Sequence, residues 1–225
     1  MPYTAEEIRA RVLYRDDGVL ILDKPPGLSV HYGTKTVEHL EQYLPWVAFG
    51  KPEPPRLAHR LDKDTAGCLV LARTAEAAAQ LGRLFLRGAV AKTYWAVAQG
   101  RPPADIGTID LPLMKVQIPG MSKVVVTPEG KPALTDWRVL AGDGRLTLLE
   151  LTPRTGRMHQ LRAHCAYSGF PILGDPIYGA DLPAPVPLHL LARAVSFPWE
   201  GGHAGATAEP PPHMAATIGT LPPVG

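Results

Sequence analysis

The sequence is poor in cysteine and has no long apolar run. Cys68 and Cys165 are the only two cysteines in 225 residues, which gives no disulfide framework and no cysteine spacing typical of a zinc site. No stretch approaches the roughly 18 to 20 consecutive apolar residues of a membrane-spanning helix. Residues 1–11 are polar and charged and lack the apolar core of a signal peptide. These absences favour a protein of the reducing cytoplasm without a membrane segment.

The charge balance excludes little by itself, because a net charge of +2 is too small to identify a polyanionic partner. Its distribution is more informative: residues 83–92 and 154–162 each carry three basic residues with no acid between them. Local surpluses of this kind suit phosphate contacts, although ordinary solvated surfaces carry them as well. A chain of this length, with 45% hydrophobic and 20% charged residues, can form one large domain with a substantial core.

Two carboxylates stand close together in residues 58–72, which read A-H-R-L-D-K-D-T-A-G-C-L-V-L-A. Asp62 and Asp64 lie among basic residues, and the apolar run from Cys68 to Ala72 that follows is typical of a buried strand. Polar side chains directly before such a strand indicate a site held by a rigid element. Solvated ion pairs in a loop would give the same pattern. The charge pattern alone leaves both interpretations open.

The spacing of apolar residues and turn formers predicts both strands and helices. Thr74 is a suitable N-cap for a helix that Gly88 would close, and residues 142–144 are typical of a hairpin turn. The predicted strands cover 19–22, 92–99, 133–141 and 145–152, and the predicted helices cover 75–87 and 158–168. The end of the chain, residues 213–225, is rich in Gly, Pro and Ala and is predicted to form a loose tail.

Residues 59–67, H-R-L-D-K-D-T-A-G, resemble H-R-L-D-x-x-T-S-G, the active-site motif of the RluA-type pseudouridine synthases, with Ala66 where that family usually has serine. Three other segments resemble motifs of the same family in the family's order. Residues 24–28 resemble K-P-x-G-L, residues 92–96 resemble K-x-Y-x-A, and residues 155–164 resemble T-G-R-x-H-Q-L-R-x-H. We expect the first of these segments to act as a structural turn.

The resemblance implies an α+β fold with a mixed, mostly antiparallel central sheet flanked by helices. It covers residues 12–212, which we expect to form one pseudouridine synthase catalytic domain, with no S4 domain before it. It also implies three catalytic residues. Asp62 is the essential group and either attacks C1′ or removes the 2′ proton, Tyr94 packs against the target base, and Arg162 holds the carboxylate of Asp62 in one orientation.

The resemblance also implies a set of substrate contacts. These are His59, Arg60, Arg157, His159 and Gln160. Arg60 would occupy the space left by a flipped base, and Arg157 and His159 would contact phosphate or line the pocket. Isomerisation of uridine is redox-neutral and transfers no external group, so we expect no cofactor. We also expect no metal, since His159 and His164 are five residues apart, which suits a zinc pair on one helical face poorly.

The function that the resemblance implies is the isomerisation of specific uridines in rRNA or tRNA to pseudouridine, by a cytoplasmic monomer that binds RNA. Two alternatives remain. The chain could be an inactive RNA-binding module on the same scaffold, although it keeps Asp62, Tyr94 and Arg162. It could instead be a hydrolase that uses Asp62 and Asp64 as an acid–base pair. The identity of the products separates the three.

Overall fold

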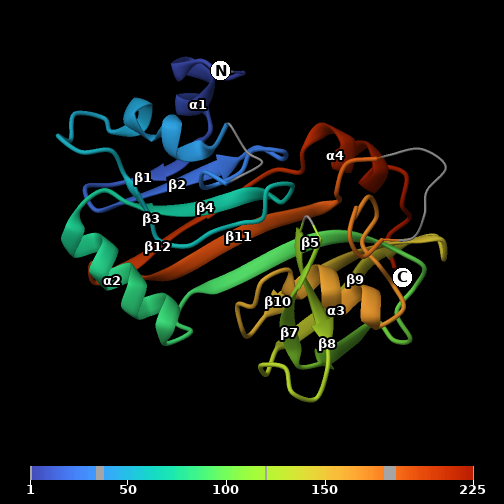
Figure 1. Cartoon of the computed structure of the whole chain (residues 1–225). Helices are drawn as coiled ribbons and strands as arrows, with labels where there is room; N and C mark the ends of the chain where they lie inside the picture. The colour runs from blue at the N-terminus through green and yellow to red at the C-terminus, as the bar shows by residue number, and fades with distance from the viewer. Residues whose placement is uncertain (1, 34–37, 120, 180–185, 225) are drawn as a thin grey trace. The chain divides into compact units, whose positions relative to one another are not determined.

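The structure is a computed structural model that describes residues 2–33, 38–119, 121–179 and 186–224. Two compact units make up the chain (Figure 1). The first unit comprises Met1–Lys92 and Ala192–Glu209, and the second comprises Thr93–Leu191 and Pro210–Gly225. Each unit is therefore assembled from two separate segments of the sequence.

The first unit is built around strand β4 (Ala66–Ala72). On one side β4 pairs antiparallel with β2 (Val19–Lys24), which pairs antiparallel with β1 (Val12–Arg15). On its other side β4 adjoins β11 (Leu190–Trp199), which pairs antiparallel with β12 (Gly202–Thr207). Every residue of β4 is buried. A strand covered on both faces reads as a continuous apolar run rather than an alternating one, which is why the sequence pattern identified it.

The remaining elements of the first unit are short, except for one helix. They are α1 (Ala5–Ala10), the 3₁₀ helices η1 (Leu40–Gln42) and η2 (Leu44–Val47), β3 (Arg56–Leu57) and α2 (Ala75–Leu86). The hydroxyl of Thr74 accepts a hydrogen bond from the Ala77 N–H at 3.1 Å and caps α2, and Gly88, with φ at +69°, follows its C-cap residue. The predicted helix is confirmed. It packs against β4 through a face that includes Leu81.

The second unit contains an antiparallel sheet in the order β5-β10-β9-β6. Its strands are β5 (Ala91–Gln99), β6 (Ile106–Asp110), β9 (Leu134–Gly142) and β10 (Leu146–Pro153). The predicted hairpin between β9 and β10 is confirmed. The carboxylate of Asp143 closes its turn by accepting the N–H groups of Arg145 and Leu146 at 2.9 and 2.7 Å.

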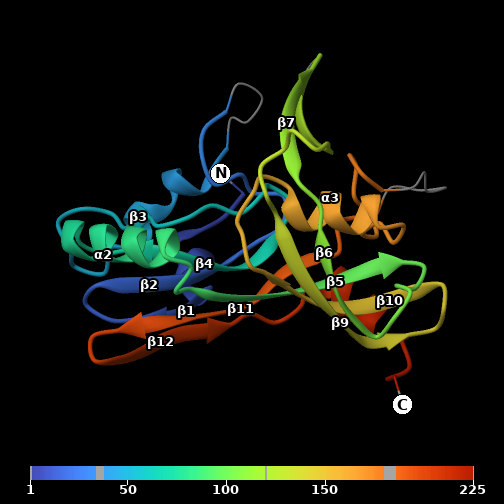
Figure 2. The same cartoon turned by 90° about the horizontal axis from the view of Figure 1, so that it is seen from below.

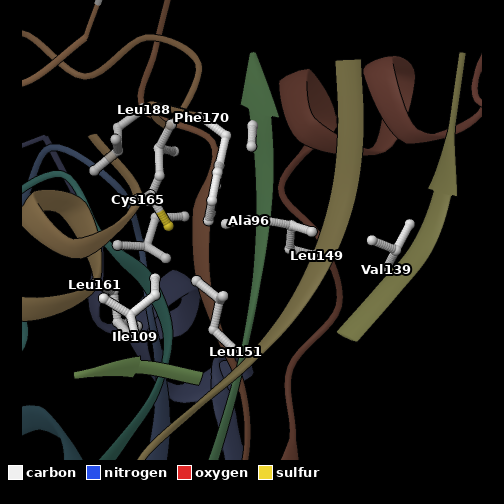
Figure 3. Packing of buried hydrophobic residues seen from close by; sticks show 12 residues of the cluster. Ala96, Ile109, Val139, Leu149, Leu151, Leu161, Cys165, Phe170 and Leu188 are labelled. Atoms are coloured by element: carbon white, nitrogen blue, oxygen red, sulfur yellow. The ribbon is translucent and has the colours of Figure 1, made fainter. Parts of the chain in front are cut away.

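The core of the second unit lies between this sheet and helix α3 (Gln160–Tyr167). Figure 3 shows Ala96, Leu149 and Leu151 of the sheet with Leu161 and Cys165 of α3, and all five are at most 7% exposed. Burial raises the pKa of the Cys165 thiol to about 12, so this cysteine behaves as an apolar core residue. The core fixes α3 on the sheet and with it the polar residues that α3 carries.

A two-stranded hairpin projects from the second unit, as Figure 2 shows. It consists of β7 (Leu113–Ile118) and β8 (Met121–Val126), which form a separate sheet. Val124 of β8 belongs to a small buried cluster with Ala163 of α3, and Tyr178 packs against that cluster. The base of the hairpin is therefore attached to α3.

The predicted loose tail is wrong, because residues 213–224 form a packed segment. Helix α4 (Pro212–Ile218) buries Met214 completely, and Leu221 is 8% exposed. The carbonyl of Pro222 accepts the Gly142 N–H at 2.9 Å, so this segment adds to the end of β9. The imidazole of His189 also contacts the Thr217 hydroxyl at 2.9 Å. Composition alone missed these contacts.

The predicted class is confirmed, since the protein has an α+β fold with a mixed, mostly antiparallel sheet. The predicted start of the helix at residue 158 is wrong, because α3 begins at Gln160. His159 precedes it with φ at 51°, a left-handed conformation that costs a non-glycine residue about 1–2 kcal/mol. No helix in the described part of the chain is both long and apolar enough to cross a membrane.

Candidate active site

Asp62 lies in a tight turn of the first unit, directly before the buried strand β4. The carbonyl of Asp62 accepts the N–H of Thr65 at 3.2 Å, which closes the turn, and Thr65 is 2% exposed. Asp62 is half-buried, whereas its neighbours Arg60 and Lys63 are exposed. The carboxylate is thus carried by a closed turn at the edge of the core rather than by a solvated loop. This favours the site interpretation of the charged segment.

Lys24 fixes the same turn from the end of the neighbouring strand β2. Its side chain is fully buried, and its ammonium donates hydrogen bonds to three backbone carbonyls, those of Pro25 (2.8 Å), Leu28 (2.9 Å) and Lys63 (2.8 Å). These bonds use all three protons of the ammonium. The expected turn at residues 24–28 is present, but its lysine also joins it to the turn that carries Asp62.

The buried lysine also interacts electrostatically with the acids of the motif. Burial lowers the pKa of Lys24 to about 7, and the negative charges of Asp64, Asp62 and Asp23 act in the opposite direction. The positive charge of Lys24 therefore faces both carboxylates of the central motif. Sequence reasoning missed this role. The available signal was a lysine at the end of an otherwise apolar strand, where only a paired charge is tolerated.

His59 holds the backbone of β4 rather than presenting its ring to solvent. Its Nε2 accepts the Val70 N–H at 3.0 Å, and its ring packs on that of Phe85 from α2 with centroids 4.8 Å apart. Burial, and then the positive charge of Lys92, lower the pKa of His59 to about 4, so the ring is neutral near pH 7. We therefore assign His59 to positioning the motif, in place of the substrate contact that the resemblance implied.

Arg162 of α3 forms a two-pronged ion pair with Asp175 in the second unit. Its Nε lies 2.7 Å from Oδ2 and its Nη2 lies 2.8 Å from Oδ1, and the two side chains are 4% and 0% exposed. Burial acts to raise the pKa of Asp175. The hydrogen bonds and charge of Arg162, together with the N–H groups of Ile177 and Tyr178, lower this pKa by more than burial raises it. The net shift of the Asp175 pKa is therefore downward.

The carboxylate partner of Arg162 in the second unit was therefore missed. The signal was present in L-G-D-P-I-Y-G, where an acid follows a buried helix in a turn-forming segment. The pairing of Arg162 with Asp62 stays a prediction, because the two residues belong to different units.

Tyr178 follows Asp175 in the same turn and contacts Arg162 and His159, two residues of the motif at 155–164. The Arg162 guanidinium carbon lies 5.5 Å from the centroid of the Tyr178 ring. The Tyr178 hydroxyl accepts the Val124 N–H of β8 at 2.8 Å and lies 3.0 Å from Nδ1 of His159. His159 is thus held by a defined contact in its left-handed conformation. This is the kind of over-determined strain that concentrates at functional sites.

Gln160 has a structural role that its sequence motif did not reveal. Its Oε1 accepts from the Thr155 hydroxyl (2.7 Å) and the Arg157 N–H (3.0 Å). Its Nε2 donates to the Leu134 carbonyl (2.9 Å) and to the Thr135 hydroxyl (3.0 Å). All four hydrogen-bonding positions of the amide are used. These bonds give the Gln160 amide a structural role, and its implied substrate contact stays a prediction.

Two further predicted residues keep side chains suited to RNA. Tyr94 of β5 is half-buried and packs against the core of the second unit, with Leu151 opposite it on β10. Arg157 is exposed, and its Nε donates to the Pro132 carbonyl at 3.1 Å. The second unit thus carries Tyr94, Arg157, His159 and Arg162, whereas Asp62, His59 and Arg60 belong to the first.

Comparison with known proteins identifies the family. Residues 18–167 match the RNA pseudouridylate synthase family. An uncharacterized RNA pseudouridine synthase of Zymomonas mobilis is 44% identical over 172 residues, 76% of this chain and 78% of that protein. Ribosomal large subunit pseudouridine synthase D of Nitrosomonas europaea is 36% identical over 223 residues, 96% of this chain and 62% of that protein. The matched part of the chain thus covers between three fifths and four fifths of the length of these two relatives.

Solved structures agree with the sequence relatives. The structure of human RNA pseudouridylate synthase domain containing 4 superposes with a TM-score of 0.82 at 28% identity, covering 96% of this chain and 94% of that one. Human RNA pseudouridylate synthase domain containing 1 gives a TM-score of 0.81 at 25% identity, with 100% and 91% covered. The fold, the motifs and these similarities agree, and the chain belongs to the RluA-type RNA pseudouridine synthases, a family of isomerases that act on RNA.

Proposed function

We propose that this protein isomerises uridines of ribosomal RNA to pseudouridine, with Asp62 as the essential catalytic group. The observation that carries the proposal is the way Asp62 is held. Its turn is closed by the Thr65 N–H and joined by the buried Lys24 to the turn at residues 24–28. A carboxylate fixed in this way meets the requirement for a preorganised catalytic group.

The reaction conserves the atoms of the nucleotide. The C1′–N1 bond breaks and a C1′–C5 bond forms, while the proton leaves C5 and N1 ends the reaction protonated. Asp62 acts either by attack on C1′ or by removal of the 2′ proton, and both routes need an ionised carboxylate. An amide in its place can do neither. No step requires an electron acceptor or an external group, so we propose an enzyme that works without cofactor or metal.

In this proposal the remaining site residues bind the RNA and orient the target uridine and Asp62. The uridine must leave its stack before Asp62 can reach C1′. Tyr94 then provides an aromatic face for the uracil, a contact worth about 1–3 kcal/mol per base. Arg162, fixed by Asp175, provides an oriented guanidinium, and Arg157 and His159 contact the RNA backbone or the pocket. Arg60 belongs to the same motif as Asp62 and takes up the space left by the base.

We propose ribosomal RNA as the first substrate to test because the names of related proteins refer to the ribosomal large subunit. One of these is ribosomal large subunit pseudouridine synthase D of Nitrosomonas europaea. Transfer RNA is the second substrate to test. We also propose that the protein acts as a monomer in the cytoplasm, with residues 12–212 as its catalytic domain. Light scattering of the purified protein tests the monomer directly.

The decisive experiment incubates the purified protein with transcripts of large-subunit ribosomal RNA and, separately, of transfer RNAs. Pseudouridine is mapped by carbodiimide adducts and primer extension. We expect modification at defined uridines, none with Asp62→Asn, and full activity with the matched variant Asp64→Asn. Activity should also survive EDTA on an unstructured substrate. RNA binding without any product would favour the inactive module, and strand cleavage or free base would favour the hydrolase.

A further inference from the structure

We infer that the outer face of α2 is a docking surface for the backbone of the substrate RNA, formed by Arg83 and Arg87 and continued by Arg60. This inference rests on the proposed function for the identity of the partner. Its two helix arginines, Arg83 and Arg87, lie outside the four sequence motifs. The RNA would extend from the nucleotide at Asp62 past His59 and across the last turns of the helix.

The first observation is that these three arginines have no partner in the described part of the chain. Their side chains are exposed and make no hydrogen bond or ion pair with another described residue. Arginines elsewhere are engaged: Arg56 with Glu53, Arg101 with Asp105, Arg138 with Glu150 and Arg154 with Asp136. By the same criterion, Arg15, which lies over the Phe49 ring, and Arg145 of the second unit are also without a hydrogen bond or ion pair among the described residues. What sets the three arginines apart is their place on α2 and in the Asp62 motif.

The second observation is that this region adjoins the Asp62 motif. The rings of His59 and Phe85 pack with centroids 4.8 Å apart and join α2 to the motif. Arg60 follows His59 in the motif, whereas Arg83 and Arg87, each two residues from Phe85, lie on the side of α2 turned away from that ring pair. The ring pair fixes the motif against α2, so a strand of RNA that leaves the motif and continues over this helix meets the two arginines on its outer side.

The third observation is that this face is exposed and that no described residue forms an ion pair with its arginines. Leu86, between the two helix arginines, is 89% exposed. Residues 77–104 contain no aspartate or glutamate, and Lys92 adds a further positive charge whose influence reaches His59. Arg83 and Arg87 are four residues apart and share one side of the helix. Two guanidinium groups so placed match successive phosphates of a nucleic acid strand, which is the charge complementarity that selects RNA.

The salt dependence of RNA binding tests this surface directly. Arg83→Gln/Arg87→Gln removes two phosphate contacts and keeps two good helix formers. The slope of log K against log salt should fall in magnitude by about 1.4 to 1.8, since each contact contributes about 0.7 to 0.9. Between 50 and 200 mM salt the affinity of the wild type should therefore fall about tenfold more than that of the variant. The rate at saturating RNA should be unchanged.

Arg101→Gln is the matched control, because Arg101 is exposed but paired with Asp105 at 2.6 Å. It should keep the slope of the wild type. If the double variant also keeps that slope while folding normally by circular dichroism, the docking surface does not exist. If the wild type makes no pseudouridine, yet the double variant alone lowers the slope, the surface stands and the proposed activity fails. The two claims are thus decided separately.

Discussion

The side-chain nitrogen of Lys24 lies 2.8 Å from the backbone carbonyl oxygen of Lys63, the residue that follows Asp62. This bond spans 39 positions of the sequence and connects two family motifs through one buried ammonium. The geometry of the turn that carries Asp62 therefore depends on a lysine 38 positions before that aspartate.

Lys24→Met should destabilise the protein and slow the reaction. Methionine fills a similar volume but leaves the carbonyls of Pro25, Leu28 and Lys63 without their donor. An unsatisfied buried carbonyl costs about 1–3 kcal/mol, so we expect the free energy of unfolding to fall by at least about 2 kcal/mol. Urea denaturation measures it. Lys63→Met is the matched control, because Lys63 contributes only its backbone oxygen; equal midpoints for the two variants would contradict the role of Lys24.

Breaking the Arg162–Asp175 pair should be far more damaging than breaking an exposed one. Asp175→Asn removes the charge that both prongs of the buried Arg162 guanidinium contact, a loss of about 3–5 kcal/mol in the free energy of unfolding. Glu150→Gln removes the exposed partner of Arg138 and should cost no more than about 1 kcal/mol. Chemical denaturation of both variants tests this, and similar stabilities would mean that the Arg162–Asp175 pair is not decisive.

Arg162→Lys should lose most of its activity although it keeps the positive charge. A lysine ammonium cannot reproduce the two parallel hydrogen bonds that the guanidinium makes to Asp175. Single-turnover rates, measured beside circular dichroism, check this. A rate equal to that of the parent would show that charge alone is enough and that the fork geometry is not needed.

Substitution of Tyr94 should separate its ring from its hydroxyl. Tyr94→Phe keeps the aromatic face and should retain most of the affinity for the target uridine. Tyr94→Ala should lose stacking worth about 1–3 kcal/mol, a decrease of roughly 5- to 150-fold in binding or rate. Titration of an RNA oligonucleotide and single-turnover rates give both quantities. Equal defects would mean that the hydroxyl, rather than the ring, is what the reaction uses.

The neutral imidazole of His59 should make the protein sensitive to acid. Its pKa is about 4 in the folded protein and about 6.5 when unfolded, so the unfolded chain binds the extra proton first as the pH falls. The stability held above pH 6.5 is therefore lost between pH 6.5 and 4, by no more than about 3 kcal/mol.

Thermal melts from pH 7 to pH 4 measure this loss in the wild type and in His59→Gln, whose amide oxygen can still accept the Val70 N–H but does not titrate. The stability curves of the two proteins should converge as the pH falls. A constant difference across that range would rule out His59 as the titrating group.

Local sequence patterns predicted the elements whose causes are local. The run Cys68–Ala72 indicated β4 because a doubly covered strand is uniformly apolar. Thr74 and Gly88 predicted the ends of α2, and Asp143 predicted the hairpin turn through bonds to residues two and three positions away. The segment that carries Asp62 was identified by its motif.

Interactions between distant residues could not be read in this way. Lys24, Asp175 and Gln160 acquire their roles from partners that the fold supplies, 39, 13 and up to 26 positions away. The prediction of a loose tail at residues 213–225 was wrong because it too ignored contacts with distant residues. The composition of residues 213–225 is typical of a loose tail, but Met214 and Leu221 find a surface to pack on, which composition does not record.

The division of each unit into two sequence segments affects the order of events during synthesis. The first unit needs β11 and β12 to complete its sheet around β4, and the second needs α4 and the residues after it to close over β9. A chain that emerges from the ribosome N-terminus first can finish neither unit until residues 192–224 are available. The turn that carries Asp62 is made early, but its sheet is completed only when β11 and β12 have been synthesised more than 100 residues later, so the nascent chain exposes the apolar edge of β4 throughout that interval.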